Sequence, residues 1–426
     1  MLALLCGSPG ASAQSLARPG WAGSGMEAET WWPHAVLCEV EPDSLATLGD
    51  PAEGATLRRL TLRLDDLRTL GIDALLLEDL EDLGNFKHDS NQHLESETPA
   101  ARAPAEAAAH AASSAVAIDP RYGTLDDFDD LVREAARRGL RILVGLRPGA
   151  QGTALTDDAR LWLNHGVTGL SLERDDPEAV RAIRGVLRGY VGARVLIAGK
   201  PDFRNLPFQP RNAPSSTSGE RSAFRNTAVA RADQPDLARI ALPSLNNGAM
   251  PMRLALAHAQ APPSGRGPVP LLSADATKAN PAAARALTTA LLGSGGAVLL
   301  RADDVDLAHA SDAAGQSSSF AWYRLWSGLH RGNAALRSGK DLLLDHDAEG
   351  VLVRVRQPPA GGAPIVILCN LTNSPITLSL VGEVANLRLR RSFLRTLARS
   401  DGGMGAMPLR AITLPPFAVY AGELSR

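Results

Sequence analysis

The chain has 426 residues, with 44 basic and 46 acidic side chains and a formal net charge of −2. This balance, without a long basic block or a basic-aromatic motif, argues against nucleic-acid binding. No run reaches the roughly 18 apolar residues that a membrane-spanning helix needs. Cys6, Cys38 and Cys369 are too far apart to indicate a disulfide framework or a zinc site, and we expect the last two to be small core residues.

The N-terminus admits two interpretations. Leu2 to Leu5 are apolar and Ala11-Ser12-Ala13 has the form of a cleavage site, but the usual basic region of a signal peptide is missing. Residues 1–25 are therefore either a signal peptide, which predicts a secreted or periplasmic protein, or the product of a mis-assigned start. In the second case Met26 is the true start, and the protein is cytoplasmic.

Strands and helices then alternate along the chain. Ala35 to Val40 reads as a strand, Leu57 to Leu70 as an amphipathic helix and Ile72 to Leu77 as a second strand. Apolar residues at helical spacing follow Thr124, which can cap a helix, and Gly139 suits its end before the apolar run Ile142 to Leu146. This order predicts repeated βα units.

Later segments continue the pattern and then change it. Further strands are predicted near Gly166, Val195 and Leu271 and after a turn at Gly293 to Gly296, while the polar stretches 95–114 and 204–236 read as loops. Short apolar or alternating segments close the chain: VLVRVRQ, IVILCNLT, ITLSL, LRLRRSFL and AITLPPFAVYAGEL. Such short segments, separated by Gly, Pro and Asn, predict an antiparallel β-sandwich.

Three segments carry a resemblance to a known family. IDPRYGTLDDF with its helix and strand, FAWYRLWSGLHRGNAALRSGKDLLLD, and the closing LPPFAVY resemble the α-amylase family, glycoside hydrolase family 13. The resemblance implies a (β/α)8 TIM barrel over residues 26–335 and a C-terminal β-sandwich over 336–426. The family inserts a domain after the third strand, and the short stretch Gly149 to Asn164 predicts that this domain is nearly absent here.

The resemblance also points to the strand ends where the family keeps its catalytic side chains. The family's nucleophile strand aligns with Gly166 to Glu173, which makes Glu173 the candidate nucleophile and places Ser171 where the family has an orienting arginine. The acid/base position is Gly199, and the last motif leaves Asp275 as the second vestigial candidate.

Other replacements weaken the expected chemistry. The third strand has Gly145, Pro148 and Gly149 where the family has an aspartate, an asparagine and a histidine. Retaining glycosidases need two carboxylates about 5 Å apart, and near Gly199 only Asp202 could reach back. Glu173 has a plainer interpretation as a solvated residue at a strand end, and Asp275 as a cap before a helix near Pro281.

No cofactor or metal is expected. The cluster Lys87 to His93 contains two histidines spaced H-x-x-x-x-H, which lacks the i, i+4 geometry of a helical metal pair and reads as a solvated loop.

The sequence thus favours a catalytically degenerate family member that binds a carbohydrate, such as an α-glucan or oligosaccharide, or a protein partner. The alternative is a weak or altered retaining α-glucosidase or transglycosylase that uses Glu173 as nucleophile. A third interpretation is that the chain is the product of a decaying gene.

Overall fold

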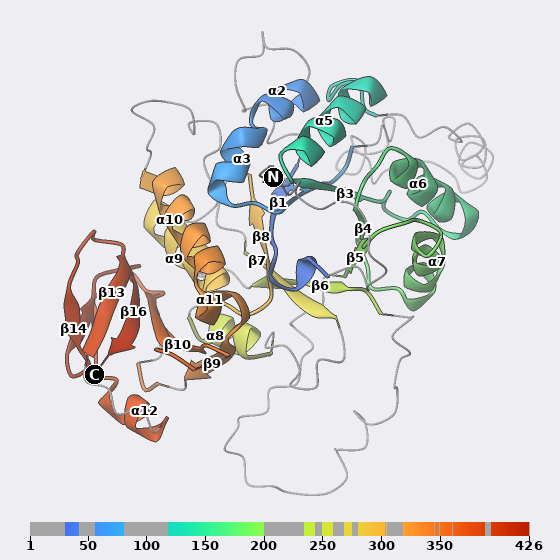
Figure 1. Cartoon of the computed structure of the whole chain (residues 1–426). Coiled ribbons are helices and arrows are strands. Elements are labelled where there is room, and N and C mark those ends of the chain that lie inside the picture. Colours follow the sequence, from blue (N-terminus) through green and yellow to red (C-terminus); the bar gives the residue numbers. More distant parts are fainter. Residues whose placement is uncertain are drawn as a thin grey trace, which may run out of the picture.

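The computed structural model describes residues 30–41, 56–80, 118–199, 234–242, 249–258, 268–274, 280–302, 304, 318–344, 346–348, 350–359, 361–387 and 393–425. Within these ranges a ring of strands is surrounded by helices, and a separate group of strands packs beside it (Figure 1).

Eight parallel strands form a closed barrel in sequence order, with β8 paired to β1. They are β1 (Val36–Val40), β2 (Ala74–Leu77), β3 (Arg141–Gly145), β4 (Gly169–Leu172), β5 (Val195–Ala198), β6 (Leu237–Leu242), β7 (Val269–Ala274) and β8 (Ala297–Arg301). The predicted TIM barrel is confirmed. Strand β6 was not predicted, because the sequence around it reads as a long polar loop.

The helices of the barrel lie outside this ring (Figure 1). They are α2 (Thr56–Leu62), α3 (Leu64–Leu70), α5 (Leu125–Arg137), α6 (Gly152–Asn164), α7 (Pro177–Leu187), α8 (Ala249–His258), α9 (Pro281–Leu292), α10 (Ser318–Gly332) and α11 (Ala334–Ser338). The single helix predicted over 57–70 is instead two helices that meet at Arg63.

The start of α5 shows how local sequence sets these elements. The Thr124 side chain accepts a hydrogen bond from the Asp127 backbone N–H, and the Asp127 carboxylate accepts one from the Thr124 backbone N–H. This capping box satisfies two donors that a helix start leaves unpaired. After α5, Gly139 takes φ +75°, which glycine adopts without strain, and β3 follows.

Successive side chains of each barrel strand point alternately into the barrel and toward the helices, which gives two hydrophobic cores. One cluster fills the barrel interior: Trp32, Ala35, Leu37, Ala74, Leu76, Leu143, Val195, Ile197, Leu237, Leu271, Ala297 and Leu299. The intervening strand residues join the helices in a larger outer core, which includes Leu146 and Leu170. These two leucines therefore do not fill the barrel interior.

The connection after β3 is short. Six residues, 146–151, separate Gly145 from the start of α6, and α6 itself covers the barrel as an ordinary crossover helix. The predicted near absence of the inserted domain is confirmed.

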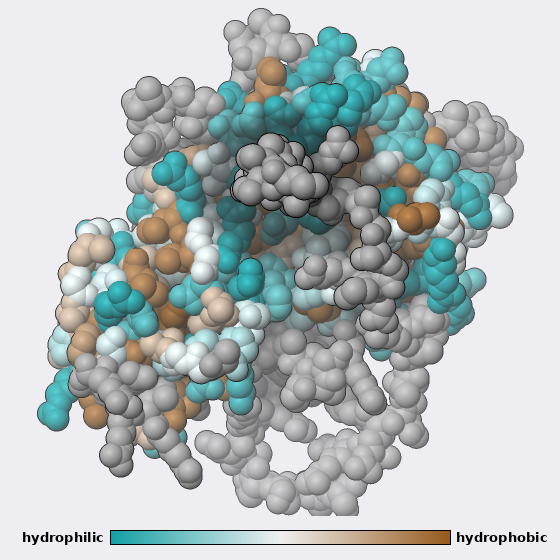
Figure 2. Space-filling model, viewed as in Figure 1, coloured by the Kyte–Doolittle hydropathy of each residue, from teal (hydrophilic) through white to brown (hydrophobic). Residues whose placement is uncertain are grey.

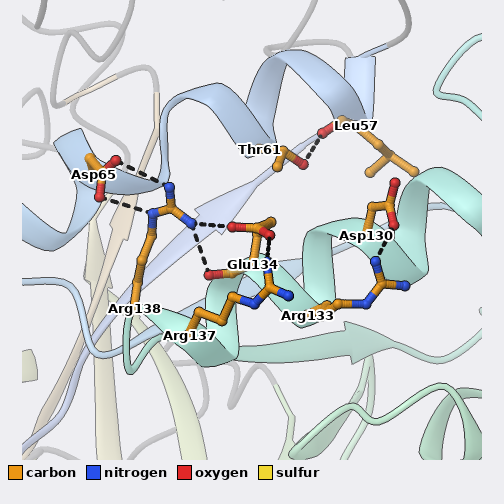
Figure 3. A network of polar contacts seen from close by, with 8 residues as sticks. All are labelled: Leu57, Thr61, Asp65, Asp130, Arg133, Glu134, Arg137 and Arg138. Carbon is orange, nitrogen blue, oxygen red and sulfur yellow. Dashed lines mark hydrogen bonds and ion pairs between the residues drawn. The ribbon is translucent and has the colours of Figure 1, made fainter.

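On the outer surface, α3 and α5 are joined by exposed ion pairs. Arg138 lies between Asp65 of α3 and Glu134 of α5 (Figure 3), and Arg137 and Arg133 extend the network along α5. In the space-filling view the surface over α2 and α5 is largely hydrophilic (Figure 2). Exposed pairs of this kind contribute little stability each.

The C-terminal strands form two antiparallel sheets, consistent with the predicted β-sandwich. The larger has the order β14-β13-β16-β11-β10-β9 and the smaller pairs β12 with β15. The strands are β9 (Lys340–Leu344), β10 (Val351–Gln357), β11 (Ile365–Asn370), β12 (Ile376–Leu378), β13 (Phe393–Arg399), β14 (Ala406–Pro408), β15 (Ile412–Leu414) and β16 (Val419–Ser425), with helix α12 (Val381–Asn386) after β12. Residues 388–392 of the predicted LRLRRSFL segment lie outside the described residues, and β13 begins at Phe393 within it.

The sheet is attached to the barrel by two buried arginines. Arg354 and Arg356 of β10 both lie near the Asp341 carboxylate, with nitrogen to oxygen distances of 3.4 Å. Arg356 also donates to the carbonyl oxygens of Ala335 and Leu336 in α11. Burial lowers the pKa of Arg356 to about 10. The joint is thus charged and almost fully buried.

Cys38 and Cys369 are free and buried, as expected of core residues. Among the described helices, none combines the length and the apolarity that crossing a membrane would require.

Candidate functional site

The carboxyl ends of the barrel strands meet at one end of the ring, where barrels of this kind place their chemistry. Side chains alternate along a strand, so the residue two places after each interior core residue also points into the barrel. Among the described residues these inward positions are Glu39, Glu78, Gly145, Ser171, Gly199, Arg239, Ser273 and Arg301.

Arg239 of β6 reaches across the barrel to two carboxylates. Its guanidinium pairs with Glu39 of β1 and, at 3.3 Å, with Glu78 at the end of β2. The side chains of Glu39 and Arg239 are 5% and 15% exposed. The Arg239 Nε–H is buried and has no hydrogen-bond acceptor within the described part of the chain.

Glu78 is the most accessible member of this group, with 22% of its side chain exposed. Its Oε1 accepts a hydrogen bond from the Ser171 hydroxyl at 3.2 Å. Burial, together with the negative charges of Glu39 and Asp79, raises the pKa of Glu78 to about 7, although Arg239 and Ser171 favour its ionised form. Asp79, directly after it, has φ 53°, a left-handed conformation that is strained for a residue with a side chain.

Gly145 makes room for Glu78. A Cβ atom at Gly145 would lie 1.8 Å from Glu78 Oε2, so the Glu78 carboxylate occupies the space into which a side chain at position 145 would project. Two positions that the sequence treats as separate losses, Gly145 and Ser171, therefore contact one carboxylate that the sequence did not single out.

Glu173, the predicted nucleophile, lies just past the end of β4 and is exposed. Within the described residues it has no hydrogen bond or ion pair. Arg174 is exposed beside it. No described side chain orients the Glu173 carboxylate, as a nucleophile would require.

Gly199, at the predicted acid/base position, is buried and takes φ +83°. A Cβ there would lie 2.9 Å from the Asp175 Cβ. Burial, and then the negative charge of Asp176, raises the pKa of Asp175. From the sequence, Asp202 is the carboxylate expected to reach this point. Asp202 lies outside the described residues, and in the described part of the chain the acidic residue next to Gly199 is Asp175, through its Cβ and backbone atoms.

The remaining predicted residues are placed only in part. Asp275 and the cluster Lys87 to His93 lie outside the described residues. The expectation that Asp275 could cap the helix near Pro281 is wrong, because the Asn280 side chain caps α9 by accepting a hydrogen bond from Ala283 N. Among the described residues no group of three or more His, Cys, Asp or Glu side chains is arranged to hold a metal ion.

Three residues of this cluster were not predicted from the sequence: Glu39, Glu78 and Arg239. A signal was present, since Glu39 interrupts the apolar run AVLCEV and Arg239 the run LARIAL. Strands of a parallel sheet covered on both faces are nearly continuous in apolar residues. A charge within such a strand therefore marks an inward position at the barrel mouth.

Comparison with curated proteins finds α-glucosidase relatives over part of the chain. The trehalose-6-phosphate hydrolase of Escherichia coli is 33% identical over 116 residues, which are 27% of this chain and 17% of that protein. A probable α-glucosidase of Rhizobium meliloti is 30% identical over 116 residues, with the same coverage. Maltase A2 of Drosophila melanogaster is 28% identical over 139 residues, 32% of this chain and 20% of that protein. The matched segment thus spans about a fifth or less of the relatives' own length.

Comparison with solved structures extends the likeness to the whole fold. The isomaltulose synthase of Erwinia rhapontici has a TM-score of 0.61 at 14% identity, covering 94% of this chain and 100% of that one. The trehalulose synthase of Pseudomonas mesoacidophila has a TM-score of 0.60 at 14% identity, with the same coverage. No family model matches the chain.

Proposed function

We propose that this chain, whose resemblance to the α-amylase family holds in sequence and in fold, binds a carbohydrate at the mouth of its barrel without the family's usual catalysis. A role in carbohydrate metabolism agrees with its relatives, which are α-glucosidases and trehalose-6-phosphate hydrolases. The loss of catalysis is our own inference from the site.

One observation carries this proposal: two catalytic positions are glycines whose side-chain space is already occupied. The Glu78 carboxylate stands where a side chain at Gly145 would project, and Asp175 lies against Gly199. Glu173 meanwhile has no orienting partner among the described residues. Each lost contact to the transition state typically raises the activation free energy by a few kcal/mol, and several losses at one site raise it further.

The groups present suit the binding of a sugar. Glu78 offers an accessible carboxylate, and Ser171 and Arg239 fix its position through hydrogen bonds and charge. Hydrogen bonds to an ionised group are stronger than neutral ones, so such a carboxylate is a good acceptor for sugar hydroxyls.

Calorimetric titration with maltose and glucose tests the proposal. We expect measurable binding to the unaltered chain and about tenfold weaker binding to Glu78→Gln, as the loss of one charge-assisted hydrogen bond implies. Glu178→Gln, which removes an exposed carboxylate at the start of α7, is the matched control and should bind like the unaltered chain. No binding of either sugar, or equal binding to Glu78→Gln, would contradict the proposal.

A second candidate function rests on the position of Asp175. In a weak retaining glycosidase, the Glu173 carboxylate would attack the anomeric carbon while the Asp175 carboxyl protonates the departing oxygen. Water would then release the sugar, with Asp175 taking its proton. The raised pKa of Asp175 agrees with an acid role.

Hydrolysis of activated and unactivated α-glucosides separates the two candidates. The second predicts turnover that is lost in Glu173→Gln for both substrates. It also predicts that Asp175→Asn loses turnover of the alkyl glucoside much more than of the aryl glucoside, whose leaving group needs little acid help. The first predicts no turnover of either substrate above the Glu173→Gln background.

A further inference from the structure

We infer that the cluster of Glu39, Glu78 and Arg239 selects a sugar that carries a protonated amine over its neutral counterpart. This inference rests on the proposed function, because it specifies the ligand of the same site. Its support comes from the charge balance of the cluster, its free hydrogen-bonding atoms and its surroundings.

The cluster holds two carboxylates and one guanidinium, so its formal charge is −1 when both acids are ionised. Arg239 is shared unequally, since it contacts Glu39 more closely than Glu78. The ion pair therefore leaves Glu78 incompletely neutralised. A cation brought by a ligand would complete the balance.

One oxygen of the cluster is available to such a ligand, and one buried donor beside it is unsatisfied. Both described polar contacts of Glu78 use Oε1, from Ser171 and from Arg239, whereas Oε2 fills the side-chain position that Gly145 leaves open and has no described hydrogen bond. The buried Arg239 Nε–H lacks an acceptor. An ammonium group would donate to Oε2, and the hydroxyl groups of a sugar would donate to the same carboxylate. An amino sugar carries both groups.

The charged groups around the cluster add to its negative field. Asp79 follows Glu78 directly, and after β4 the acidic Glu173 and Asp175 flank a single base, Arg174. Arg301 of β8 is already paired with Glu41 at 3.2 Å. The inward positions of β3, β4, β5 and β7 carry no charge, since they are Gly145, Ser171, Gly199 and Ser273. Opposite charges attract more strongly at a partly buried site than in water, so this end of the barrel favours a cation.

The test compares three monosaccharides by calorimetric titration at about pH 7.2, just above the pKa of about 7 of Glu78: glucose, glucosamine and N-acetylglucosamine, the last being the uncharged counterpart of the second. We expect the full chain to bind glucosamine about tenfold more tightly than either neutral sugar. In Glu78→Gln this preference should disappear while glucose binding remains detectable. Glu178→Gln should keep the preference.

A second variant guards against a folding defect in the first. Gly145→Ala places a methyl group where Glu78 Oε2 lies, so the carboxylate must turn away and the preference should fall as in Glu78→Gln. Equal affinity for all three sugars in the unaltered chain, or a preference that survives in both variants, would overturn the inference and leave the proposed function standing. If none of these sugars nor maltose binds, the proposed function fails with it.

Discussion

A Cβ atom on Gly145 would lie 1.8 Å from Glu78 Oε2, so the two positions on neighbouring strands compete for one volume. The chain gives that volume to the carboxylate of β2. The polar centre of the barrel mouth is consequently built from β1, β2 and β6, and it is held by Arg239.

Substitution at Gly145 should reveal this competition directly. We expect Gly145→Ala to lower the free energy of unfolding by about 1–3 kcal/mol, the usual cost of overpacking. The loss should be smaller when Glu78 is first shortened to alanine. Urea denaturation of the two single variants and the double variant measures the coupling. Gly185→Ala, in α7 where a Cβ meets nothing within 4 Å, is the control and should stabilise the protein by about 0.5–1 kcal/mol. Additive effects of Gly145→Ala and Glu78→Ala would contradict the shared volume.

The raised pKa of Glu78, about 7, gives stability a defined pH dependence. The folded state holds the Glu78 proton over the window from pH 4.5, the ordinary value, to pH 7, while the unfolded state releases it. Stability from this group therefore falls as pH rises through that window. We expect Glu78→Gln to gain stability relative to the unaltered chain between pH 5 and pH 8, by at most about 3 kcal/mol. The urea midpoints of both proteins at pH 5 and pH 8 measure this gain. A stability difference between variant and unaltered chain that is the same at both pH values would refute the prediction.

His330 should act at the opposite end of the barrel. Its Nδ1 lies 2.9 Å from the Leu292 carbonyl oxygen and its Nε2 lies 3.3 Å from that of His34. Burial lowers the pKa of His330 below 6.5, so the folded state favours the neutral ring and the shorter contact places its proton on Nδ1. As pH falls below 6.5 the unfolded state binds a proton more readily, and stability is lost.

Replacing His330 by glutamine tests this account. The variant should be less stable than the unaltered chain at pH 7.5, because it disturbs a buried contact. The gap should narrow as the pH falls to 5.5. Thermal unfolding at both pH values measures the gap, and a gap that widens in acid would show that His330 is charged in the folded protein.

The joint between barrel and sheet depends on Asp341. Replacing it by asparagine leaves Arg354 and Arg356 buried without their shared counter-charge, and the Gly295 N–H loses a carboxylate acceptor. Removing one partner of a buried ion pair costs about 3–5 kcal/mol, and we expect a loss of that size in calorimetric unfolding. Asp401→Asn, which breaks an exposed pair with Arg399, should cost about 1 kcal/mol or less. Similar losses for the two variants would contradict a buried joint.

The sequence was sufficient for most of the fold because periodicity and capping are local. Thr124 and Gly139 bound α5 and its turn as predicted. Strand β1, which ends at Val40, and strand β5, which begins at Val195, were recognised by their apolar runs. Strand β6 was missed because it directly follows the long polar stretch 204–236 and its apolar run is interrupted by Arg239.

The site was harder to predict because it depends on contacts between strands distant in sequence. Alignment with the family identified the replaced positions Gly145, Ser171 and Gly199. It could not show that Glu78 fills the first, since 67 residues separate it from Gly145 in the numbering. Arg239 lies on the strand that was not predicted. Only closure of the barrel brings these residues together.

The most direct test of the central claim is a single NMR experiment on an aryl α-glucoside mixed with the purified chain. Saturation-transfer signals from the sugar protons report binding, and the released phenol reports hydrolysis in the same tube. We expect clear transfer to the sugar, weakened in Glu78→Gln, and no phenol above the Glu173→Gln background. Phenol release that disappears in Glu173→Gln would contradict the loss of catalysis and establish Glu173 as a working nucleophile.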